Sequence, residues 1–246
     1  MKRVFPVLLV VFSMVAHIQM AFAADTVERP EYVKSLVSQV IAAYGGEKAV
    51  EGTTGVHAVG VINALMRHDR GTYELSFKRP GKLRVDTKYQ RSLETRILNG
   101  NNGYRGTDEV PLAQVKDLRL LAMVYQYKHF DILYGLLKGL YSVSRKGNED
   151  LSGNRVEVLH LVDQEGPPMD AYVDARTFLI VKVTGYFAMP GGQTTTLSSE
   201  FSDFRKVADT VFPFTIASYA GGQKIAETIM KTYSINPAIP DSVFAP

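Results

Sequence analysis

The chain has 246 residues, of which 46% are hydrophobic and 22% charged, the proportions of a globular protein rather than a disordered or fibrous one. It has no cysteine, which excludes disulfides, thiolate metal sites, a thiol nucleophile and a lipid-modified N-terminal cysteine. The 28 basic and 25 acidic residues nearly balance, and binding to nucleic-acid phosphates needs clustered basic surface, so we expect no nucleic-acid partner.

Residues 1–23 have the pattern of a secretory signal peptide. Lys2 and Arg3 form a positive start, the uncharged run 4–24 follows, and Ala-Phe-Ala precedes Ala24 as a peptidase site. We expect cleavage before Ala24 and an exported mature protein with one domain, 24–246. The alternative is an uncleaved anchor, because a run of this length could just span a bilayer.

The first element of the mature chain is predicted to be a helix at 31–44. Apolar residues recur there at intervals of three and four, Pro30 suits a first helical turn, and Gly45 and Gly46 end the pattern. This spacing predicts an amphipathic helix with one buried face.

Beyond Gly52 the apolar period changes to two. Tyr73, Leu75 and Phe77 share one face of a predicted strand, and a turn at 80–81 leads to Leu83 and Val85 in the next strand. Such alternation is typical of antiparallel strands with one solvated face. Similar runs, mostly bounded by Gly, Pro, Asn or Asp, occur at 55–64, 91–98, 154–162, 169–175, 178–187, 195–204, 211–219 and 224–235.

The segment 112–140 interrupts this series. It is rich in Leu, Met and Tyr, it follows Pro111, and Leu118, Leu121 and Tyr125 have helical spacing. We expect one or two helices set into the middle of the sheet.

These elements predict a mainly β (α+β) protein. Two or three helices cannot cover a flat sheet of about ten strands, so we expect a curved antiparallel half-barrel with helices across its mouth. The sequence leaves open whether its interior is a cavity or a filled core.

Several motifs, taken in order, resemble the LolA-like periplasmic proteins, which include the outer-membrane lipoprotein-sorting carriers. They are GG at 45–46, NGNNGY at 99–104, YVDARTFLIVKV at 172–183, FSDFRKVADTVFP at 201–213 and INPAIPDSVF at 235–244. The resemblance implies an open half-barrel covered by helices, with an apolar cavity that receives acyl chains. Taken singly, each motif can also serve turn or hairpin geometry.

The sequence offers little sign of catalysis. His57, His68, His129 and His160 have no second ligand at metal-binding spacing, and no serine-hydrolase, transpeptidase or dinucleotide motif occurs. The glycines of 100–106 indicate a turn rather than a phosphate cradle. We therefore predict no catalytic residue, no metal and no cofactor, and we expect His57 and His160 to be hydrogen-bonded on a sheet surface.

One hairpin concentrates positive charge. Lys78, Arg79, Lys82 and Arg84 flank its turn, either as a solvated tip or as a contact for anionic head groups or a partner.

The resulting hypothesis is a soluble periplasmic protein that carries a lipid or lipoprotein acyl moiety between the inner and outer membranes. Its partners would be donor and acceptor proteins of these two membranes. Two alternatives remain: an envelope-stress sensor or protein-interaction module without lipid transfer, and a hydrolase with scattered catalytic residues. Met123 on the covering helix would be an adaptable lining residue of the cavity. The residues predicted to form the cavity wall and the covering helix are Tyr73, Leu75, Phe77, Leu83, Val85, Leu118, Leu121, Met123 and Tyr127.

Overall fold

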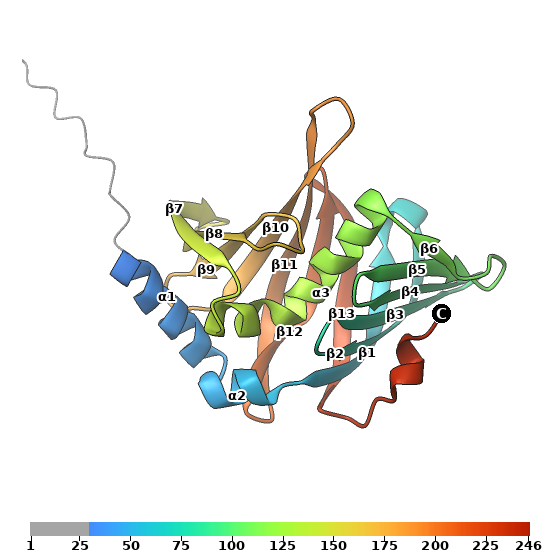
Figure 1. Cartoon of the computed structure of the whole chain (residues 1–246), viewed down its shortest axis with the longest axis horizontal. Helices are drawn as coiled ribbons and strands as arrows, with labels where there is room; N and C mark the ends of the chain where they lie inside the picture. The colour runs from blue at the N-terminus through green and yellow to red at the C-terminus, as the bar shows by residue number, and fades with distance from the viewer. Residues whose placement is uncertain (1–29) are drawn as a thin grey trace, which may run out of the picture.

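The structure is a computed structural model that describes residues 30–246. The predicted leader and its cleavage site lie outside the described residues. All thirteen strands form one antiparallel sheet, which is curved and does not close (Figure 1). This confirms the predicted fold class.

The strand order shows how the chain builds the sheet from its centre. The order is β6-β5-β4-β3-β2-β1-β13-β12-β11-β10-β9-β8-β7, so the first six strands are laid outward from β1 and the last seven return from the opposite edge. The strands are β1 (Gly55–Ala64), β2 (Asp69–Lys78), β3 (Lys82–Tyr89), β4 (Leu93–Asn99), β5 (Asn102–Thr107), β6 (Ala113–Val115), β7 (Ser142–Leu151), β8 (Asn154–Val162), β9 (Met169–Asp174), β10 (Ile180–Ala188), β11 (Thr194–Val207), β12 (Thr210–Ala220) and β13 (Gln223–Ile235).

Helix α3 (Asp117–Leu137) connects the two edge strands β6 and β7 and therefore crosses the sheet (Figure 1). Its 21 residues span about 31 Å at 1.5 Å per residue. The predicted helical segment 112–140 thus contains a single helix. The first part of that segment is not helical, because Ala113–Val115 pairs with β5 as the edge strand β6.

Four further elements cover the ends of the sheet. Helix α1 (Pro30–Ala43) buries Val33, Leu36 and Val40, as its spacing predicted, and packs on α3 and β7, while α2 (Glu47–Gly52) follows it. The 3-10 turn η1 (Leu65–Arg67) joins β1 to β2, and η2 (Asp241–Phe244) packs against β3 and β4 with Phe244 fully buried.

The apolar interior is divided into two main cores, one on each side of α3. The first, the helix-side core, joins α1 and α3 to β8, β9 and β10. The second, the hairpin-side core, joins α3 to β1, β2, β3, β4 and β13. A narrow helix cannot fill the concave face of so broad a sheet, and most residues of β12 are only half-buried. The two cores therefore leave a gap between them over the middle strands around β12, which we call the seam.

Within residues 30–246, no helix combines the length and apolar character that crossing a bilayer requires.

Candidate functional site: a cavity beneath helix α3

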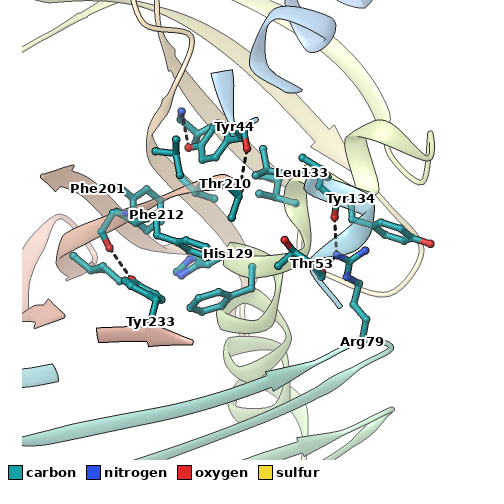
Figure 2. A pocket seen from close by; sticks show the side chains of 18 residues that line it. Tyr44, Thr53, Arg79, His129, Leu133, Tyr134, Phe201, Thr210, Phe212 and Tyr233 are labelled. Atoms are coloured by element: carbon teal, nitrogen blue, oxygen red, sulfur yellow. Dashed lines mark hydrogen bonds between the residues drawn. The ribbon is translucent and has the colours of Figure 1, made fainter. Parts of the chain in front are cut away.

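Two adjoining cavities lie along the seam between the cores. The inner cavity has a volume of about 70 Å³ and is walled by the second half of α3, the α1–α2 region and strands β10 to β13. Most of its lining is apolar, and aromatic side chains including His129, Phe212 and Tyr233 gather at one end while Arg79 and Tyr134 lie at the other (Figure 2).

The mouth cavity continues the seam under the first half of α3. Its volume is about 360 Å³, which falls in the range of small-molecule sites, about 300 to 1,000 Å³. Along β12 the inner cavity begins at Thr210 and the mouth cavity reaches Tyr219, nine residues further, or about 30 Å of extended strand. The combined space is long and narrow, and it runs parallel to the middle strands.

The side chains of His129, Phe130 and Ile216 line both cavities and form the partition between them. The His129 ring meets Tyr125 and Phe201 edge to face, at centroid distances of 4.6 and 5.4 Å. Its buried Nε2 atom has no hydrogen-bond partner among the described residues. Burial lowers the pKa of His129 to about 3, so the imidazole is neutral at physiological pH and can offer one hydrogen bond to a ligand or water.

Three consecutive residues fasten α3 to the sheet around the mouth cavity. The Tyr125 hydroxyl donates to the Val183 carbonyl at 2.9 Å on the helix-side core, and Gln126 Nε2 donates to the Tyr73 hydroxyl at 3.0 Å on the other. The Tyr127 hydroxyl accepts from the backbone N–H of Gly81 at 2.9 Å. Because α3 is anchored to the sheet on both of its sides, it spans the mouth cavity and leaves the space beneath it open.

The entrance of the mouth cavity is charged. Arg67, Arg96, Arg105 and Glu94 line it, beside Tyr89. The Glu94 carboxylate accepts hydrogen bonds from Arg67, at 3.3 Å, and from Arg105. Burial by itself would raise the pKa of Glu94, but the hydrogen bond from Arg105 and the surrounding guanidinium charges lower it below its usual range. Glu94 is therefore ionised at neutral pH.

The structure brings most of the sequence-predicted site residues together, but in packed contacts. Seven of them belong to the hairpin-side core, where the rings of Phe77 and Tyr127 are 5.1 Å apart. The other two, Leu118 and Leu121, pack against the helix-side core. Of all nine, only Tyr73 lines either cavity. Met123 is 4% exposed and packs against Gly103, where a side chain would collide with it.

The basic hairpin residues form contacts within the chain. Lys78 and Lys82 pair with Asp241, at 2.8 and 2.7 Å, and Arg84 pairs with Asp86 at 2.6 Å. The Arg79 guanidinium donates to backbone carbonyls of the α2 region and lies 4.0 Å above the Tyr134 ring. These side chains hold the C-terminal segment and α2 to the hairpin, which a solvated tip would not do.

The two strand histidines are hydrogen-bonded, as predicted. His57 Nδ1 lies 3.2 Å from the Ser76 hydroxyl. His160 Nδ1 lies 2.7 Å from the carboxylate of Asp170, which is completely buried and also accepts from Lys146 and Tyr186 at 2.8 and 2.5 Å. This network ties four neighbouring strands, β7 to β10, together. Among residues 30–246, no group of three or more His, Cys, Asp or Glu side chains is placed to hold a metal ion.

Sequence reasoning missed the partition and the charged entrance. His129 sits in a helical segment whose neighbours alternate between the two cores, so its spacing alone did not single it out. Arg96 and Arg105 come from strands four and five, and the second of these was interpreted as a turn. Glu94 and Arg96 share a strand face with Leu98 of the hairpin-side core, and this period of two was the available signal for charged residues on the concave face.

Comparison with known proteins supports the same fold. No protein-family model matches the sequence, and no curated protein matches it. Among solved structures, the chain is similar to a domain assigned to outer membrane lipoprotein sorting from Vibrio parahaemolyticus (TM-score 0.57, 12% identity, 87% of this chain and 97% of that one). It is equally similar to a LolA superfamily protein from Nitrosomonas europaea (TM-score 0.57, 14% identity, 87% and 97%). A DUF1329 family protein from Desulfovibrio piger gives a TM-score of 0.54 at 13% identity, over 86% and 96%.

The chain therefore has a LolA-like fold, as its motifs suggested. At identities of 12 to 14%, these neighbours establish the fold and carry no residue-level assignment.

Proposed function

We propose that this protein is a periplasmic, non-catalytic carrier that binds a lipid or lipoprotein acyl chain in the cavity beneath α3 and moves it between the inner and outer membranes. The observation that carries the proposal is the long space along β12, which is mainly apolar in its inner part and open at its mouth. The predicted signal peptide supports export, and membrane donor and acceptor proteins would load and unload the cargo.

Burial of the acyl chain supplies the driving force. Each methylene removed from water contributes about 0.8 kcal/mol, so a chain of about sixteen carbons offers on the order of 10 kcal/mol before ordering costs. That is enough for affinity in the micromolar range or tighter. Phe130 and Ile216 lie where a chain would have to pass from the mouth cavity to the inner one, and side-chain rotation there would join the two spaces.

The proposal is tested by filling the partition. Ile216→Trp adds a large ring at the point shared by both cavities, and the free volume there should accommodate it without loss of folding. A fluorescent probe with an uncharged acyl chain should bind the wild-type protein with increased emission, and Ile216→Trp should weaken that binding by about tenfold or more.

A matched control is available on the neighbouring strand. Ile229 of β13 is 46% exposed and does not line either cavity. Ile229→Trp introduces the same ring outside the cavities and should bind the probe as the wild type does. Absence of probe binding by the wild type, or equal binding by Ile216→Trp, would contradict the proposed function.

A further inference from the structure

The charges at the entrance of the mouth cavity do not balance. Of the charged side chains that line the cavity, Arg67, Arg96 and Arg105 are positive and only Glu94 is negative. Glu94 is already occupied by hydrogen bonds from Arg67 and Arg105. Arg96 forms no hydrogen bond and no ion pair with any other residue in 30–246.

The backbone register makes this excess costly. Arg96 of β4 and Arg105 of β5 are direct partners across the antiparallel pair, so their side chains leave the sheet on the same face. Like charges directly opposite one another destabilise a sheet. The half-buried Arg96 shares the charge of one carboxylate, Glu94, with Arg67 and Arg105, and an anion placed between Arg96 and Arg105 would relieve the remaining repulsion.

The rest of the cavity changes from charged to apolar with distance from this entrance. Tyr73 and Tyr89 lie beside the arginines, and the guanidinium of Arg67 is 4.9 Å above the Tyr89 ring. Beyond the partition the inner cavity is lined by Phe201, Phe212 and other mainly apolar side chains, and its one charged lining residue, Arg79, lies at the far end, where backbone carbonyls and Asp131 satisfy it. This gradient matches a ligand with a polar head at the mouth and an apolar tail inside.

We infer that the mouth cavity is a head-group site and that the cargo is an anionic amphiphile, whose phosphate or carboxylate is bound by Arg96 with help from Arg105. This inference rests on the proposed function and adds the charge class of the cargo. A guanidinium fork suits either anion, because it can donate two parallel hydrogen bonds to oxygens of one group.

The test compares single-chain lipids that share one acyl chain and differ in head group. The probes are lysophosphatidylglycerol, which is anionic, lysophosphatidylcholine, which is zwitterionic, and monoacylglycerol, which is neutral, each below its micelle concentration. Isothermal titration with the wild-type protein should show binding of the anionic lipid about tenfold tighter than that of the neutral one, as expected for a charge-assisted hydrogen bond.

Three variants locate the effect. Arg96→Gln should remove most of this preference by weakening binding of the anionic lipid far more than that of monoacylglycerol, whereas Arg96→Lys should retain part of it. Arg91→Gln is the matched control, because Arg91 is exposed in the β3–β4 turn, does not line the cavity and changes the net charge equally. It should bind all three lipids as the wild type does.

The outcomes separate the two proposals. Equal affinity of the wild type for all three lipids, or an equal loss of preference in Arg91→Gln, would overturn the head-group inference while leaving the carrier function intact. Failure of every lipid to bind would overturn both. Binding of inorganic phosphate alone as tightly as the anionic lipid would show a free-anion site, which would also overturn the inference.

Discussion

His129 should destabilise the folded protein at mildly acidic pH, and replacing it by phenylalanine should abolish this effect. Its Nε2 atom is buried in the partition without a hydrogen-bond partner in residues 30–246, and burial lowers its pKa to about 3. In the unfolded chain the same imidazole has a pKa of about 6.5. Below that pH the unfolded chain therefore binds a proton that the folded protein excludes.

The sign and size of the effect follow from this difference. The folded pKa is depressed, so the stabilising contribution is complete above about pH 6.5 and is lost progressively as the pH falls toward about 3. Between about pH 7 and about pH 5, the unfolding free energy should fall by about 2 kcal/mol through this one group.

Urea unfolding of the ligand-free protein at several pH values measures the effect. In His129→Phe, the decline between about pH 7 and about pH 5 should be smaller than in the wild type by about 2 kcal/mol. The aromatic ring preserves the edge-to-face contacts with Tyr125 and Phe201. His68→Asn is the control, because His68 is exposed and its left-handed backbone suits asparagine, and it should keep the wild-type decline. An undiminished decline in His129→Phe would refute the buried, unpartnered state of this histidine.

Two further predictions concern stability. Met123→Asp places a charge in the packed contact between α3 and β5 and should lower the unfolding free energy by about 3 kcal/mol or more, measured by thermal or urea unfolding. Met123→Leu should lower it by less than about 1.5 kcal/mol. A mild effect of the aspartate would show that this contact is open to water. Burial alone would raise the pKa of Asp170, but hydrogen bonds from Lys146, Tyr186 and His160 lower it, so its contribution is present above about pH 4 and lost below. Asp170→Asn should cost about 2 kcal/mol at neutral pH and flatten the decline below about pH 4, and an unchanged acid profile would contradict the network.

The antiparallel sheet was predictable from the sequence where one face is apolar. Alternation located strands such as β2 and β3, because Tyr73, Leu75 and Phe77 all point into one core. It failed for β5 and β7. At Gly103 in β5, Leu120 and Met123 occupy the space that a side chain would fill. Glycine at this position interrupts the alternation of apolar and polar residues by which the other strands were predicted. Edge strand β7 is largely polar and is ordered by pairing with β8.

The cavity was less predictable, because periodicity assigns a residue to a face without showing what covers that face. The predicted site residues Leu75, Phe77, Leu83 and Val85 are on the apolar side of their strands, where they belong to the same core as Met123 and Tyr127 of α3. The space lies instead over β12 and β13, where the helix crosses from one core to the other. That offset depends on the path of α3 between the sheet edges, which is a property of the topology.

The most direct test of the central claim is native mass spectrometry of the protein purified from its own host cells, followed by lipid extraction. The account predicts a lipid adduct on the wild-type protein, the same adduct on Ile229→Trp, and a much reduced one on Ile216→Trp. Wild-type protein free of lipid, or an adduct that Ile216→Trp retains in full, would contradict an acyl-binding cavity beneath α3.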